Sequence, residues 1–136
     1  MNDEQYMRRA LELAKRAQDE GEVPIGAVLV LEEQIIGEGW NRPIAASDPT
    51  AHAEVQAMRA AALARRNYRL TGASLYVTLE PCEMCVGAMF HARIARAVYG
   101  ATDPKKQVLK NQVVLQGGVL AAECGSILSN FFAAKR

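Results

Sequence analysis

The chain lacks any apolar run close to the roughly 18 residues that a membrane-spanning helix needs, so the sequence predicts no membrane partner. Its 136 residues include only three cysteines, and this odd number argues against a framework of disulfide bonds. It also lacks an excess of charge, because 16 lysines and arginines face 15 aspartates and glutamates. That balance neither favours nor excludes a nucleic-acid partner. The charged first residues are unlike a signal peptide, so we expect a cytoplasmic protein.

Half of the residues are hydrophobic, which is enough for one packed core. Without linkers, repeats or low-complexity tracts, residues 1–136 are predicted to form one domain. The same hydrophobic content implies exposed apolar helices, which fit a homodimer.

Local patterns predict helices that alternate with strands. The first helix carries apolar residues at helical spacing, with Asn2 or Asp3 as its N-cap and Gly21 at its end. Further helices are predicted over 51–64 with Thr50 as N-cap, from Pro81 to about residue 92, and over 122–135. Strands are predicted over residues 26–31, 34–40, 73–79, 96–101 and 111–116. This order gives a three-layer α/β/α domain around a five-stranded mixed sheet.

Two short motifs carry the residues suited to chemistry. "AHAEV" places His52 and Glu54 at the start of the second helix, and "PCEMC" places Cys82 and Cys85 at the start of the third. Two cysteines three residues apart share one helix face and can hold one metal ion. One imidazole and two thiolates supply three of the four ligands that zinc prefers, which leaves a position open for water, as in catalytic zinc sites. The sequence therefore predicts one Zn²⁺ per chain, held by these three side chains.

Glu54 has a different predicted role from its neighbour His52. Two residues along a regular helix correspond to about 200° of rotation, so the two side chains share a direction only near the helix end. A carboxylate beside the activated water can accept its proton and pass it to a substrate. We therefore predict Glu54 as the catalytic residue.

Other readings of these cysteines remain open. A C-x-x-C pair is also typical of thioredoxin-like redox sites. A structural zinc site with three cysteines and His52 would recruit Cys124, and the chain would then be a non-catalytic, zinc-stabilised binding module. As an inert alternative, Cys124 is a small buried residue.

A further group of arginines fits two interpretations. Arg59, Arg65, Arg66 and Arg69 lie within eleven residues. They form either an RNA-binding face or an ordinary solvated helix face.

The two motifs together, H-x-E followed by P-C-x-x-C, resemble the zinc nucleobase deaminases. The segments "EVPIGAVLV", "GEGWNRPI", "DPTAHAE", "NYRL" and "LYVTLEPCEMCVGAM" are similar to the bacterial tRNA adenosine deaminases over nearly the whole chain. The resemblance implies a cytidine-deaminase-like fold, a homodimer, and hydrolytic conversion of adenosine to inosine at the wobble position of a tRNA anticodon. A deaminase acting on single-stranded DNA, on either adenine or cytosine, or on a free base or nucleoside is the alternative.

The resemblance also implies residues around the base. It suggests Asn41 as a contact to the base, with Val23, Pro24 and Pro43 lining or shaping the pocket. The predicted substrate-binding residues are Asn41, Val23, Pro24, Pro43, Ala53, Asp103 and Phe131.

One segment departs from the family that the chain resembles. Residues 102–111 are shorter than the family's connection between strands four and five. A parallel crossover usually needs a dozen or more residues. The fifth strand is therefore reached by an unusually tight crossover or runs antiparallel.

Overall fold

The structure is a computed structural model that describes residues 1–104 and 113–135. Its sheet has the strand order β2-β1-β3-β4-β5. The first strand pairs antiparallel with both neighbours, whereas the last three strands run parallel. The strands are β1 Gly26–Leu31, β2 Gln34–Trp40, β3 Ser74–Leu79, β4 Arg96–Ala101 and β5 Val114–Gln116. The helices are α1 Asp3–Asp19, α2 Pro43–Ala46, α3 Ala53–Arg65, α4 Glu83–Ala92 and α5 Ala121–Ala134.

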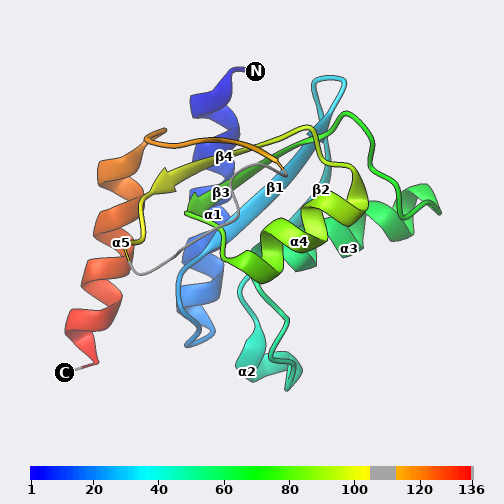
Figure 1. Cartoon of the computed structure of the whole chain (residues 1–136). Helices are drawn as coiled ribbons and strands as arrows, with labels where there is room; N and C mark the ends of the chain where they lie inside the picture. The colour runs from blue at the N-terminus through cyan, green and yellow to red at the C-terminus, as the bar shows by residue number, and fades with distance from the viewer. Residues whose placement is uncertain (105–112, 136) are drawn as a thin grey trace.

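Helices cover both faces of the sheet, as the three-layer prediction requires. Figure 1 shows α3 and α4 together on one face, with α1 and α5 on the other. Each face has its own hydrophobic cluster, one built around Leu29, Leu75 and Met89 and the other around Met7 and Val28. Successive side chains of a strand point to opposite faces, so apolar runs such as residues 26–31 serve both clusters.

The position of α3 depends on two glycines of β2. A Cβ atom on Gly39 would lie 2.4 Å from the carbonyl oxygen of Ala53 and from the backbone nitrogen of Ala57. A Cβ atom on Gly37 would lie 2.3 Å from the carbonyl oxygen of Ala57. Because any side chain there would overlap the helix backbone, the glycines allow α3 to rest directly on the strand.

Several predicted boundaries are confirmed. Asn2 is the N-cap of α1 and exchanges hydrogen bonds with Gln5 in a capping box. The strands at residues 26–31, 34–40 and 96–101 have the predicted bounds.

The predicted starts of the two helices at the site are wrong. His52, not Thr50, is the N-cap of α3, and Cys82 is the N-cap of α4, so Pro81 precedes that helix. The reason at α3 is local competition: the Thr50 hydroxyl donates to Asp48 Oδ1 at 2.7 Å and is thereby engaged outside the helix. Residues 43–46, which lie outside every helix and strand predicted from the sequence, form the short helix α2.

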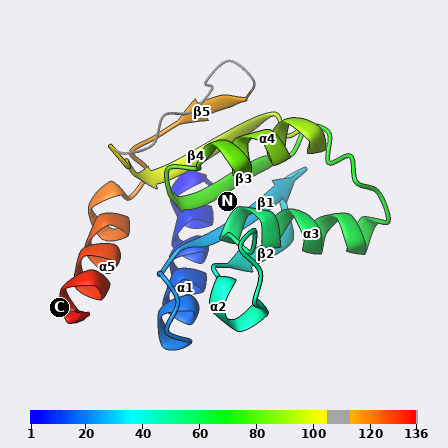
Figure 2. The ribbon, with the colours of Figure 1, turned by 60° about the horizontal axis from the view of Figure 1, so that its bottom comes forward.

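Of the two predicted directions for the last strand, parallel after a tight crossover or antiparallel, the structure shows the parallel one. β5 pairs parallel with β4, with Arg96 opposite Val114 (Figure 2). It begins at Val114, and the part of the predicted strand at residues 111–112 lies outside the described residues. None of the helices in the described part of the chain is both long enough and apolar enough to cross a membrane.

Candidate active site

The candidate site forms where two helices begin at the same edge of the sheet. His52 and Cys82 are the N-cap residues of α3 and α4, and both have extended backbone angles. Neither side chain makes a capping hydrogen bond to its own helix. The two side chains instead point toward each other, and Cys85, in the first turn of α4, completes the group.

The spacing of this group fits a zinc ion. The His52 Nδ1 atom lies 3.6 Å from the Cys82 sulfur and 3.5 Å from the Cys85 sulfur. Zinc bonds of about 2.3 Å to sulfur and about 2.0–2.1 Å to nitrogen, at a tetrahedral angle, place nitrogen and sulfur about 3.5–3.6 Å apart. Both nitrogen–sulfur distances therefore match those that tetrahedral zinc imposes, and Nδ1 is the histidine atom that would meet the metal.

The charges around the two sulfurs also suit a cation. A hydrogen bond from Cys85 lowers the pKa of Cys82 to about 3, and His52 contributes to the same shift. The pKa of Cys85 is raised, first by its hydrogen bond to Cys82, then by burial and by the nearby Glu54 carboxylate. In the absence of a metal, the Cys85 sulfur thus keeps its proton because the Cys82 thiolate and the Glu54 carboxylate lie beside it. A divalent ion bound there would offset their negative charge.

Glu54 lies beside the ligand group without belonging to it. Its side chain is only 4% exposed, and its carboxyl group interacts with the Cys85 sulfur. His52 stands outside the helix and Glu54 inside its first turn, so the 200° rotation that separates such residues within a helix does not apply. The arrangement allows Glu54 to hold a proton next to the metal position.

Cys124 takes no part in this site. It is fully buried in the cluster between the sheet and the α1–α5 layer, whereas Cys85 is buried on the α3–α4 side. The Cys124 sulfur would lie 2.3 Å from a Cβ atom on Gly100, so it packs against β4. The four-ligand structural zinc site is therefore wrong, while the inert, buried interpretation is confirmed. Burial also raises the pKa of the Cys124 thiol to about 12.

Asn41 connects the loop after β2 to the start of α3. Its Oδ1 atom accepts a hydrogen bond of 3.1 Å from the backbone N–H of Ala53, and its own N–H donates to the carbonyl of Ile25. Both Asn41 and Ala53 are buried. The side-chain oxygen of Asn41 thus fixes the backbone between His52 and Glu54.

Two of the other predicted substrate contacts share a pocket. Val23 and Asp103 line a cavity of about 360 Å³ together with Phe132. Its remaining lining residues are Leu79, Thr102, Pro104 and Leu128. Because Leu79 ends the strand that leads to Cys82, this cavity opens at the same edge of the sheet as the candidate site.

Of the two adjacent phenylalanines near the end of α5, the predicted Phe131 does not line this cavity, and its neighbour does. Phe131 is 9% exposed and is absent from the lining of this cavity, whereas Phe132 is 47% exposed and lines it. Neighbouring residues on a helix differ by about 100°, so only one of the two rings can face the cavity.

Two buried glutamates that the sequence reasoning missed hold the surrounding loops. The Glu22 carboxylate accepts hydrogen bonds from the backbone N–H groups of Ile44, at 3.2 Å, and Ala45, at 2.8 Å. Glu80 accepts one of 2.9 Å from the N–H of Asp103. The sequence offers one indication of their role, which is an acidic residue next to apolar ones. Glu22, for example, directly precedes Val23 and Pro24.

Pro24 and Pro43 occupy two of the connected loops. Pro24 is fully buried. Pro43 is the first residue of α2, where its fixed backbone angle suits a helix start.

Comparison with known proteins gives a consistent result. The family model described as "Cytidine and deoxycytidylate deaminase zinc-binding region" matches residues 1–101. The tRNA-specific adenosine deaminase of Haemophilus influenzae is 50% identical over 147 positions, covering 98% of this chain and 85% of the relative. Since 147 positions exceed the 136 residues of the chain, that relative has residues without a counterpart here.

Solved structures resemble the chain as well. A structure from a study of A-to-I editing by tRNA:A34 deaminases at the wobble position has a TM-score of 0.87 and 41% identity. It covers 91% of this chain and 99% of its own. The guanine deaminase of Bacillus subtilis has a TM-score of 0.71 and 42% identity, covering 75% of this chain and 66% of its own.

Proposed function

Because this chain belongs to the zinc-binding cytidine and deoxycytidylate deaminase family, and within it to the tRNA-specific adenosine deaminases, we propose that its substrate is the wobble adenosine of a tRNA anticodon. The chain is a hydrolytic deaminase with a zinc cofactor. The reaction consumes one water, breaks the bond between C6 of the purine ring and its amine, and releases inosine and ammonia. The observation that carries the proposal is the His52–Cys82–Cys85 group at zinc spacing with the buried Glu54 beside it.

His52, Cys82 and Cys85 hold the zinc ion in this proposal. When bound, the ion supplies a Lewis acid that lowers the pKa of water toward neutrality. The N-terminal ends of α3 and α4 both point at this position, and their partial positive charge favours the thiolate form of the two cysteines.

Glu54 moves the protons of the reaction. It accepts a proton from the attacking water, delivers one to the ring nitrogen next to the reacting carbon, and delivers another to the departing amine. Its burial keeps the carboxyl group out of bulk solvent, so the protons pass from the water to the substrate through Glu54 and do not exchange with the surroundings.

The predicted substrate residues bind the flipped nucleotide. The NH₂ group of Asn41 donates to the base, and Ala53 packs beneath it where Asn41 fixes its backbone. Val23 and Asp103 lie in the cavity that would receive a flanking nucleotide, and Phe132 offers it a ring. Pro24 and Pro43 shape the wall formed by their loops.

Mass spectrometry of the deaminated products, inosine from adenosine and xanthine from guanine, tests the substrate. We expect product from an RNA hairpin with the anticodon-loop sequence, and none from free adenosine, free guanine or single-stranded DNA. Product from free guanine in place of the hairpin would support the second candidate, a free-base deaminase, which the similarity to the Bacillus subtilis guanine deaminase favours.

The role of Glu54 has a separate test. Glu54→Ala should retain one zinc per chain by elemental analysis and lose deamination, because the variant keeps all three ligands and removes only the proton carrier. A Glu54→Ala enzyme with wild-type turnover would refute the mechanism. His52→Ala serves as the control that loses the metal.

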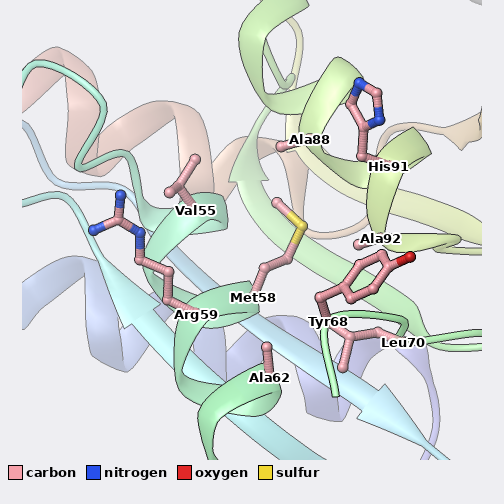
Figure 3. A pocket seen from close by; sticks show the side chains of 9 residues that line it. All are labelled: Val55, Met58, Arg59, Ala62, Tyr68, Leu70, Ala88, His91 and Ala92. Carbon is pink, nitrogen blue, oxygen red and sulfur yellow. The ribbon is translucent and has the colours of Figure 1, made fainter. Parts of the chain in front are cut away.

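We further propose that the chain forms a homodimer through the outer face of α3 and α4. A cavity of about 280 Å³ opens between these helices, and Figure 3 shows Met58, Tyr68 and His91 around it. Several large apolar side chains on or beside the two helices are exposed: Leu63 at 79%, Tyr68 at 66%, Phe90 at 44% and Met84 at 39%. A second copy presenting the same apolar face is the partner with matching chemistry.

Light scattering after gel filtration tests the dimer. A dimer is expected for the wild type, and Leu63→Glu should shift it to a monomer because the new charge would be buried at the interface. Glu4→Lys, an exposed charge change on α1, is the matched control. A monomeric wild type would refute the interface.

The same proposal covers organisation and location. Residues 1–136 act as one catalytic domain, because α5 packs its buried Cys124 on the central sheet that carries the site. We place the enzyme in the cytoplasm, where its proposed tRNA substrate is found. Fractionation of cells that express a tagged chain checks this location.

A further inference from the structure

Charge is distributed unevenly along the chain although its total is nearly zero. The first 54 residues contain eleven acidic and five basic residues, whereas the remaining residues contain four acidic and eleven basic ones. Residues 55–79 contain four arginines and no aspartate or glutamate. Residues 55–95, which include α3 and α4, therefore carry an excess of positive charge, with five arginines against two glutamates.

Four arginines gather where α3 and α4 end. Arg65 is the last residue of α3, Arg66 is its C-cap, and Arg93 is the C-cap of α4. Arg69 lies in the connection that follows α3, and the next residue, Leu70, donates a backbone hydrogen bond of 2.7 Å to Ala92 at the end of α4. The four side chains, here termed the basic cluster, are all exposed.

Exposed aromatic rings accompany the basic cluster. The Arg69 guanidinium lies 5.6 Å from the centre of the Tyr68 ring, and its Nε donates to the Tyr68 hydroxyl at 3.1 Å. The Arg93 guanidinium lies 5.4 Å from the centre of the Phe90 ring. The pKa of Tyr68 is lowered by Arg69 first and also by Arg93, so both cations act on one hydroxyl. Guanidinium groups held on exposed rings are the combination that RNA-binding surfaces use for phosphates and bases.

Acidic partners do not neutralise the basic cluster. All of the acidic residues in the sequence lie within the described residues, and the ion pairs found there engage other arginines, such as Arg9 with Glu38 and Arg59 with Asp48. The helix dipole favours a cation at Arg65, Arg66 and Arg93, and the Arg93 guanidinium also donates to the Phe90 carbonyl at 2.9 Å. Neither effect accounts for Arg69 on the Tyr68 ring. The cluster thus presents four charges to solvent that a polyanion would complement.

We propose that the basic cluster binds backbone phosphates of the substrate nucleic acid outside the nucleotide that reacts. The identity of this polyanion rests on the proposed function. α3 has 13 residues and rises about 1.5 Å per residue, so the cluster lies about 20 Å from His52 at the other end of the helix. That distance spans several nucleotides, so the cluster can reach the stem of a hairpin whose loop enters the site.

A second copy of the chain is a poorer partner for the basic cluster than a nucleic acid. In a symmetric dimer the same patch on both copies would bring eight arginines together near the axis, and their repulsion would oppose association. Tyr68 and Phe90 belong both to the apolar face and to the surroundings of the arginines, so the cluster borders the proposed dimer interface, with its charges at the edge.

Salt-dependent binding without turnover tests the inference. Fluorescence anisotropy would measure the affinity of a labelled RNA hairpin, and of its isolated loop strand, across a range of salt concentrations. Arg65→Gln with Arg66→Gln removes two charges from the cluster. Arg8→Gln with Lys15→Gln removes two exposed charges from α1, on the opposite face of the sheet, and is the matched control.

For the hairpin, a plot of log affinity against log salt concentration has a negative slope. The cluster variant should make this slope shallower by about 2, since each lost phosphate contact reduces its magnitude by about 1. The control should keep the wild-type slope, and both variants should bind the loop strand as the wild type does. Equal slopes for the two variants would overturn the inference, and so would loss of the dimer in the cluster variant alone, which would assign the arginines to self-association. Binding is measured without deamination, so a chain that binds the hairpin but forms no inosine would contradict the proposed function and leave this inference standing.

Discussion

Glu22 offers the sharpest test of how the loops around the site are held. It is 2% exposed, and its two carboxylate oxygens accept the N–H groups of Ile44 and Ala45 at the start of α2. This contact fixes the loop that carries Asn41 and Pro43 against the loop that carries Val23. We expect Glu22→Ala to loosen both loops while leaving the zinc ligands in place.

The expected loss of stability follows from those two hydrogen bonds. A hydrogen bond to a charged group contributes about 1.5–3 kcal/mol, and a buried N–H left without a partner costs about 1–3 kcal/mol. Ile44 is 74% exposed, so its N–H can recover water when the carboxylate is removed. We therefore expect Glu22→Ala to lower the free energy of unfolding by about 2–3 kcal/mol. Glu22→Gln, which keeps one acceptor, should lower it by about half as much.

The assay combines stability, metal content and kinetics. Urea unfolding gives the free energy, elemental analysis gives the zinc content, and inosine formation gives kcat and KM. We expect unchanged zinc, a raised KM, and partial rescue in Glu22→Gln compared with Glu22→Ala. Asp19→Ala, which removes an exposed charge at the end of α1, is the control for net charge. A Glu22→Ala enzyme with the stability and KM of the wild type would refute the reasoning.

Three further outcomes are expected. Gly39→Ala should destabilise the fold by about 3 kcal/mol or more in urea unfolding, because its Cβ would overlap α3 at 2.4 Å; a wild-type midpoint would show that the helix can shift freely. In metal-free protein, iodoacetamide should modify Cys82 at a rate that stays flat from pH 5 to pH 8, since its pKa of about 3 keeps it a thiolate throughout; a rate that rises tenfold per pH unit would contradict that pKa. Cys124→Ala should retain one zinc per chain, whereas Cys82→Ser should lose it; zinc loss from both variants would return Cys124 to the ligand set.

The sequence was informative where local pattern decides structure. Apolar runs gave the bounds of β1, β2 and β4, and the composition of two short motifs identified residues that the fold brings to zinc spacing. Zinc ligands are restricted to a few residue types at short spacings, so they can be recognised in a sequence without knowledge of the fold.

The sequence-based predictions failed where a residue outside the local segment determines a helix start or a loop contact. Thr50 is a residue type typical of an N-cap, but its hydroxyl donates to Asp48. Asn41, in the loop after β2, instead accepts the backbone N–H of Ala53. The partners of Glu22 lie more than twenty residues away, so no local pattern could indicate them. The choice between adjacent aromatic rings at the end of α5 depends on the rotation of that helix against the sheet, which the sequence alone does not fix.

The bare strand under α3 has a consequence for how precisely the site is built. Where side chains separate two elements, rotamer changes can absorb small displacements. At Gly37 and Gly39 the backbone of β2 packs directly against the backbone of α3. No side-chain rotamer can change there to absorb a displacement of the helix. The place of the histidine nitrogen and of the Glu54 carboxyl group is then set by the curvature of β2 itself. A substitution that flattens or twists β2 would therefore displace α3, and with it the side chains of His52 and Glu54.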